Sequence, residues 1–122
     1  MKMKNRDFYT LFIEAASEPD EDLYIAEWGT SSIFCPDPDA PAPDIDAVVR
    51  DLREIWRAAH MSVRDIRKAA GLTQAEIAAH FGMPARTVQN WESASPSAAR
   101  SCAPYIRLMM AEALDIVHVD RG

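Results

Sequence analysis

The chain has 122 residues, of which 48% are hydrophobic, and carries a net charge of −6 at pH 7. This is enough apolar material for a core, but no run of about 20 apolar residues is present, which excludes a membrane-spanning helix of ordinary length. Cys35 and Cys102 are too few and too far apart for a disulfide framework, and MKMKNRDF lacks the apolar core of a signal peptide, so we expect free thiols and a cytoplasmic protein.

Charge is distributed unevenly along the chain. Residues 1–59 contain 6 basic and 13 acidic side chains, a net charge of −7, whereas residues 60–122 contain 7 basic and 6 acidic side chains. Within residues 62–107 the balance is 6 basic against 3 acidic side chains, a net charge of +3. This asymmetry indicates two parts of the chain with different partners.

The front part is expected to contain two short helices. The first has the i, i+3, i+4, i+7 spacing of one apolar helix face, formed by Phe8, Leu11, Phe12 and Ala15. A second helix is expected between Ser17, a candidate N-cap, and Gly29, a candidate stop, although LYIAEW within it could also form a strand.

Four prolines between residues 36 and 43 then favour an extended linker, because proline is excluded from helix and sheet interiors. We place the main boundary here. Residues 1–43 are expected to be an acidic helical N-terminal extension with its Pro-rich linker, and residues 44–122 a second domain that begins with a leading helix over 44–60.

The leading helix has the clearest pattern in the chain. Asp44 is its candidate N-cap, and seven apolar residues follow on one stripe: Ile45, Val48, Val49, Leu52, Ile55, Trp56 and Ala59. The stripe is expected to face a core, and an oligomer seam is the alternative.

Four further helices are expected behind it. Ser62 with Asp65, and Thr73 with Glu76, have the spacing of capping boxes, and Gly71 and Gly82 are candidate stops. Another helix is expected from Pro84 to Glu92. After an irregular segment, Pro104 is expected to begin a last helix with an apolar surface.

The two short helices on either side of Gly82 have the pattern of a helix-turn-helix. The small side chain of Ala78 allows close approach, and glycine can adopt the positive φ of a sharp turn. The outward positions of the second helix are short or hydrogen-bonding, and none is acidic: Ala85, Arg86, Thr87, Gln89 and Asn90. Arginine can bond guanine, and asparagine or glutamine can bond adenine, in the major groove. Gln74 begins the preceding helix, where backbone N–H groups can meet a phosphate.

The segment LTQAEIAAHFGMPARTVQNWE resembles the lambda-repressor-like helix-turn-helix family, of Cro and Xre type. The pattern is carried by Leu72, Thr73, Gln74, Ile77, Ala78, Phe81, Gly82, Trp91 and Glu92. The resemblance covers about residues 62–116 and implies an all-α bundle that binds DNA. The family usually has glycine where this chain has Ala94, and SPSAA lengthens the following loop.

The resemblance also implies roles for individual residues. Gln74 and, in the loop, Arg100 correspond to phosphate-contacting positions, Thr87 to a backbone contact, and Ala85, Arg86 and Asn90 to base-reading positions. The candidate DNA-binding residues are therefore Gln74, Pro84, Ala85, Arg86, Thr87, Gln89, Asn90 and Arg100.

We expect a sequence-specific DNA-binding regulator of transcription, a repressor, that binds double-stranded DNA as a homodimer. The alternative is an antitoxin or adaptor whose residues 1–43 bind a protein partner and whose helix-turn-helix serves autoregulation. The acidic front half could also temper DNA affinity by charge repulsion. No enzyme, cofactor or metal site is expected, because no nucleophile motif is present and His60, His80 and His118 are widely spaced.

Overall fold

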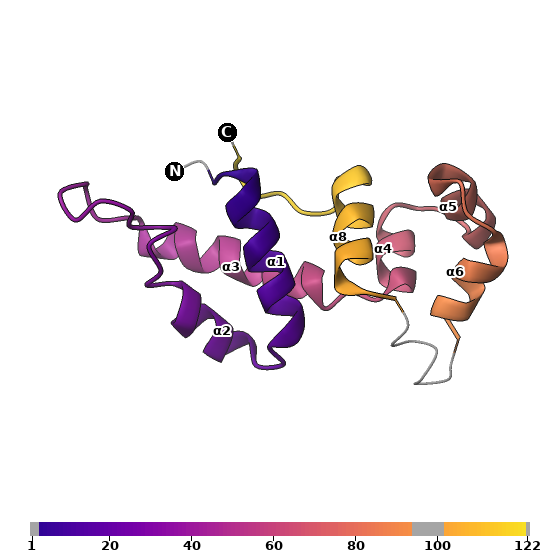
Figure 1. The fold of residues 1–122 in the computed structure, drawn as a ribbon, viewed down its shortest axis with the longest axis horizontal. Helices are drawn as coiled ribbons and strands as arrows, with labels where there is room; N and C mark the ends of the chain where they lie inside the picture. Colours follow the sequence, from indigo (N-terminus) through magenta and orange to yellow (C-terminus); the bar gives the residue numbers. More distant parts are fainter. Residues whose placement is uncertain (1–2, 94–101, 122) are drawn as a thin grey trace. The chain divides into compact units, whose positions relative to one another are not determined.

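The computed structural model describes residues 3–93 and 102–121 and shows an all-α chain, as expected (Figure 1). In this part of the chain, β-structure is limited to one isolated bridge between Met3 and Arg121. None of the helices described is long and apolar enough to cross a membrane. The described residues form seven helices: α1 (Asn5–Ser17), α2 (Glu21–Trp28), α3 (Ile45–Ala59), α4 (Val63–Ala69), α5 (Gln74–Phe81), α6 (Ala85–Trp91) and α8 (Pro104–Ala113).

The chain divides into two compact units, and the boundary differs from the one expected at residue 44. The first unit is Met1–His60 together with Val117–Gly122, and the second is Met61–Ile116. The leading helix α3 therefore belongs to the first unit, because its apolar stripe packs against α1 and α2. The second unit is inserted into the first, which is built from two separate stretches of sequence.

The core of the first unit is formed where α1 and α2 pack on α3. The predicted face of α1 is correct, since its four apolar residues are fully buried, as are two residues of the α3 stripe: Phe8, Leu11, Phe12, Ala15, Leu52 and Ile55. The α3 stripe thus serves as core. Tyr24 of α2 is also buried, and its hydroxyl donates a hydrogen bond of 2.8 Å to the Leu11 carbonyl. Burial raises the pKa of Tyr24, with the negative charge of Glu14 acting in the same direction.

The helical alternative for LYIAEW is the correct one, but α2 begins later than expected. Its N-cap is Asp20, whose carboxylate accepts hydrogen bonds from the amides of Asp22 and Leu23. Ser17 instead ends α1, where its hydroxyl donates to the Glu14 carbonyl. Gly29 is the C-cap of α2, as expected.

The C-terminal end of α3 is fastened to the end of α1 by two aromatic side chains. Trp56 Nε1 donates to the Glu18 carbonyl at 2.8 Å, and His60 Nε2 donates to the Ala15 carbonyl at 2.8 Å. The two rings stack at a centroid distance of 4.0 Å. These contacts hold the last turn of α3 within the first unit.

The C-terminal segment returns to the first unit and pairs with its beginning. The Met3 amide donates to the Asp120 carbonyl at 2.8 Å, and the Arg121 guanidinium lies 4.2 Å from the centroid of the Phe8 ring. The His118 amide donates to Glu54 at 2.6 Å. Residues near the two ends of the chain thus pair with each other within the first unit.

The second unit has a separate core, to which α4, α5, α6 and α8 contribute. Its buried members are Val63, Ile66, Ile77, Ala78, Val88, Cys102 and Met110. Trp91 packs half-buried against this core.

Candidate nucleic-acid interface

The turn between α5 and α6 has the geometry that the sequence predicts. Thr73 caps α5, and its capping box with Glu76 is complete, since each side chain accepts a hydrogen bond from the other residue's backbone amide. At the other end Gly82 adopts φ of 66°, and the next amide, of Met83, donates to the Ala78 carbonyl at 2.9 Å. This hydrogen-bonded reversal ends α5 and turns the chain sharply into α6.

Helix α6 is short and is held by its inner face. Val88 is fully buried, and Ala85 and Trp91 are half-buried against the same core. The helix begins at Ala85, one residue later than expected, with Pro84 as an N-cap that has no side-chain hydrogen bond to the helix. Its N-terminal end is therefore free of an acidic or hydroxyl cap.

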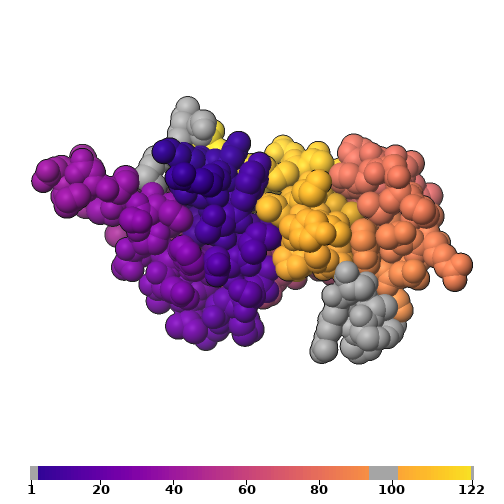
Figure 2. Space-filling view, viewed as in Figure 1, coloured from indigo at the N-terminus to yellow at the C-terminus, as the bar shows by residue number. Residues whose placement is uncertain are grey.

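The remaining side chains of α6 form its outer face, which is part of the surface of the second unit (Figure 2, orange). Arg86, Gln89 and Asn90 are exposed and Thr87 is half-buried. The first turn of α6 contains no acidic residue. One cation and two amides are thus presented together, which are the groups that bond base edges in the major groove.

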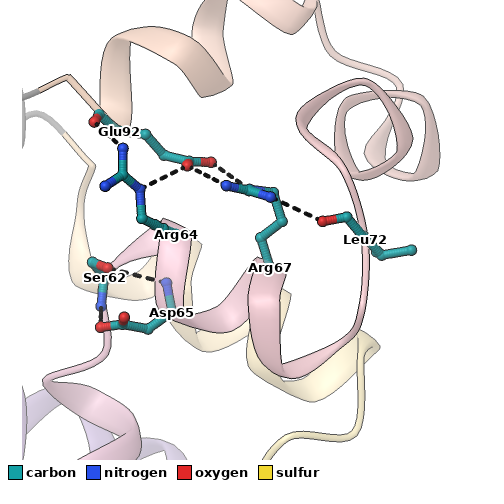
Figure 3. A network of polar contacts seen from close by, with 6 residues as sticks. All are labelled: Ser62, Arg64, Asp65, Arg67, Leu72 and Glu92. Atoms are coloured by element: carbon teal, nitrogen blue, oxygen red, sulfur yellow. Dashed lines mark hydrogen bonds and ion pairs between the residues drawn. The ribbon is translucent and has the colours of Figure 1, made fainter.

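A buried carboxylate fixes the C-terminal end of α6 (Figure 3). The Glu92 side chain is 1% exposed, and Arg67 of α4 binds it with two hydrogen bonds of 2.8 Å, from Nε to Oε2 and from Nη2 to Oε1. Arg64 Nε adds a contact of 3.3 Å to Oε1. Arg67 Nη1 also donates to the Leu72 carbonyl at 3.0 Å. The network therefore joins α4, the turn before α5 and the end of α6.

The hydrogen-bond donors around Glu92 favour the charged form of its carboxylate. The hydrogen bonds from Arg67 lower the pKa of Glu92 most, and hydrogen bonds from Gln74 and Arg64 act in the same direction, against the opposing effect of burial. Gln74, at the first position of α5, is half-buried.

Seven of the eight candidate residues lie in the described part of the chain. Six of them are on or directly before α6, from Pro84 to Asn90, and Gln74 is at the start of α5. Arg100 lies outside the described residues. Sequence reasoning did not anticipate the roles of Arg64 and Arg67, although their spacing of three residues places both on one face of a helix, where both can reach one carboxylate.

Comparison with known proteins agrees with this geometry. A family model described as helix-turn-helix matches residues 63–100, which include α4, α5 and α6. No curated protein and no solved structure matches the chain.

Proposed function

Residues 63–100 are a lambda-repressor-like helix-turn-helix, and from this premise we propose that the protein is a sequence-specific DNA-binding regulator of transcription, acting as a repressor. A single observation carries the proposal. The outer face of α6 presents Arg86, Gln89 and Asn90 to solvent, without an acidic side chain among them.

The support for α6 is as relevant as its surface. A reading helix must keep its position when its side chains meet the bases. Here Val88 anchors the helix from inside, and Glu92 ties its end to Arg67 of α4. In the proposed complex α6 enters the major groove, Arg86 bonds a guanine, and the start of α5 with Gln74 lies against a phosphate.

The proposed binding unit is a homodimer. A seven-residue helix reaches few base pairs, so one copy would bind weakly. Two copies related by a two-fold axis would read half-sites about 34 Å apart, one turn of the double helix.

The test is selection of bound sequences from a random duplex library, with wild type beside Arg86→Ala. We expect wild type to enrich a two-fold-symmetric site, and the variant to lose preference at one position in each half-site. Arg50→Ala is the matched control, since it removes the same charge from an exposed side chain of the first unit. Failure of wild type to enrich any sequence at low salt would overturn the proposal.

The first unit supports a second candidate function, that of an antitoxin or adaptor. It has its own core and carries fourteen Asp and Glu against seven Lys and Arg, a surface suited to a basic protein partner. Deleting residues 1–43 would remove α1 and α2 from Leu52 and Ile55, so surface substitutions give a cleaner test. If this candidate is correct, Leu23→Lys in α2, whose side chain is exposed, abolishes partner binding without weakening DNA binding. Loss of both activities together would argue against it.

A further inference from the structure

A cavity of about 120 Å³ lies in the first unit, at the first turns of α3. Four separate stretches of sequence contribute to its wall: the start of the chain at Met3, the turn that ends at Phe34, residues 43–51 and the returning segment at Asp120. The volume equals that of about four water molecules, at about 30 Å³ each in the liquid, so it admits a ligand of about four non-hydrogen atoms.

Part of the cavity wall is apolar. Met3, Phe34 and Val48 line it and are 4%, 3% and 5% exposed. Ala47, directly before Val48 in α3, also lines the cavity and is half-buried. Methylene groups that cover such a surface are removed from water together with it, which favours a ligand that has a short alkyl part.

The polar part of the wall is mainly anionic. Asp44, Asp51 and Asp120 contribute carboxylates, against one guanidinium from Arg50. Asp44 uses its Oδ1 to cap α3, where it accepts two backbone hydrogen bonds. Asp51 makes no such cap, and its side chain is only 18% exposed.

The negative charge of Asp51 is incompletely compensated within the protein. Its ion pair with Arg50 spans 3.7 Å, which is longer than a hydrogen bond, and the Arg50 side chain is 73% exposed. Burial therefore raises the pKa of Asp51, although Arg50 acts in the opposite direction. A carboxylate that is removed from water in this way gains from a cation placed beside it.

Other classes of ligand fit this wall less well. An anion would meet three carboxylates, and a neutral apolar molecule would cover Asp51 without pairing its charge. A metal ion needs several oxygen or nitrogen ligands at once, and the described residues include no group of three His, Cys, Asp or Glu side chains that could hold one.

We propose that the cavity binds a primary ammonium group on a short alkyl chain, with the nitrogen beside Asp51 and the carbons against the apolar part of the wall. An ammonium is a compact charge with three donors, so it suits a cavity of this size better than a planar guanidinium does. A free alkylamine and the lysine side chain of a partner protein share this chemistry. In either case the first unit has a ligand of its own, separate from DNA.

The test is titration of the full chain with n-propylamine, which has four non-hydrogen atoms, followed by NMR of the backbone amides. We expect a dissociation constant of about 1 mM or lower, with the largest shifts at residues 44–51 and at Asp120. n-Propanol and propionate are similar in size and are expected to bind at least about tenfold more weakly, because neither places a positive charge beside Asp51. No binding of n-propylamine at about 10 mM, or equal binding of the three compounds, would overturn the proposal.

Two variants separate this cavity from a general attraction of cations to an acidic unit. Asp51→Asn keeps the shape of the side chain and is expected to weaken n-propylamine binding at least about tenfold. Asp39→Asn removes an exposed charge elsewhere in the same unit and is expected to change binding by less than about twofold. Ala47→Leu fills the cavity, leaves every charge in place and is expected to weaken binding as strongly as Asp51→Asn. Equal effects of the two aspartate variants, or wild-type binding by a folded Ala47→Leu, would contradict the proposal.

Nα-Acetyl-lysine N-methylamide distinguishes the two sources of the ammonium group. Tighter binding of this compound than of n-propylamine assigns the cavity to a lysine of a partner protein, because the peptide groups then add contacts at its mouth. Weaker binding assigns it to a free alkylamine. None of these measurements uses DNA, so their outcome is independent of the proposed function.

Discussion

Arg67 and Glu92 form a two-pronged ion pair, with both nitrogen-to-oxygen distances at 2.8 Å, between the first helix of the inserted unit and the end of α6. The carboxylate is 1% exposed and the arginine side chain 15% exposed. The pair therefore connects α4 with the end of α6, the helix proposed to read DNA, and its consequences for stability can be measured.

Removal of Arg67 should destabilise the second unit far more than removal of Arg64. Arg67→Ala leaves the Glu92 charge buried, and loss of one partner of a buried pair costs about 3 kcal/mol or more. The Arg64 side chain is 54% exposed and lies farther from the carboxylate, at 3.3 Å, so we expect Arg64→Ala to cost less than about 1 kcal/mol. Urea unfolding followed by circular dichroism compares the two variants. Equal losses would show that the pair is not the main attachment of α6.

The same carboxylate makes stability depend on pH. Its pKa is held below the ordinary value of 4.5, chiefly by the Arg67 hydrogen bonds. Since the folded state binds the proton more weakly than the unfolded state, this contribution is fully present above the unfolded pKa and is lost as the pH falls through the folded pKa. Glu76, whose pKa is lowered by its bond to the Thr73 amide, acts in the same direction.

We therefore expect the free energy of unfolding to decrease as the pH falls below about 4.5, and to decrease less steeply in Glu92→Gln. Urea unfolding at a series of pH values between 3 and 7 measures both slopes. Asp115→Asn serves as the control, because it removes an exposed carboxylate from the same unit. A variant Glu92→Gln with the wild-type slope would exclude Glu92 as a source of the acid sensitivity.

The loss of stability on substitution of Gly82 should depend on how readily the new residue adopts a positive φ. At φ of 66° an added Cβ meets no atom within 4 Å, so the penalty comes from the backbone alone. Gly82→Ala is expected to cost about 1 kcal/mol and Gly82→Asn less, because asparagine adopts this region more readily. The comparison of the two by thermal unfolding distinguishes backbone strain from steric overlap, which would make the larger asparagine the worse residue.

The local features of this fold could be predicted from the sequence. Caps and turns depend on neighbouring residues, so the boxes at Ser62 and Thr73, the N-cap Asp44 and the stop at Gly82 are all found where their residue types indicate. The start of α2 was predicted wrongly, because Asp20 and not Ser17 is the residue that caps it. Asp115, which adopts φ of 54° after the last helix, carries no comparable signal.

The long-range features could not be predicted from the same patterns. An apolar stripe shows that α3 needs a partner but not which one, and the structure pairs it with α1 and α2. The return of Asp120 to Met3 joins residues at opposite ends of the sequence, and no periodicity records such a contact. The part of the site that lies on a single helix face could be predicted from the sequence. The contact of Glu92 with Arg67 could not, because the two residues are 25 positions apart.

The acidic first unit is joined to the second unit at both ends of the insertion. Because both ends of the second unit continue directly into the first, at His60–Met61 and Ile116–Val117, an acidic body is tethered to the proposed DNA-binding unit at two points. Charges on this body should oppose the approach of DNA phosphates and lower affinity for every sequence alike. Neutralising three exposed carboxylates of this unit, by Glu14→Gln, Glu27→Gln and Asp39→Asn, should therefore strengthen DNA binding.

Fluorescence anisotropy with the selected operator and with a scrambled duplex, from low to high salt, separates the possible causes. Repulsion predicts a gain on both duplexes that is largest near 10 mM salt, where the screening length is about 30 Å, and that vanishes toward 1 M salt, where it is about 3 Å. A gain confined to the operator, or one that persists at high salt, would instead indicate a change in the fit of α6 to the bases. Unchanged affinity at low salt would show that the acidic unit does not act on DNA binding through its charge, and would leave a protein partner as the explanation for its composition.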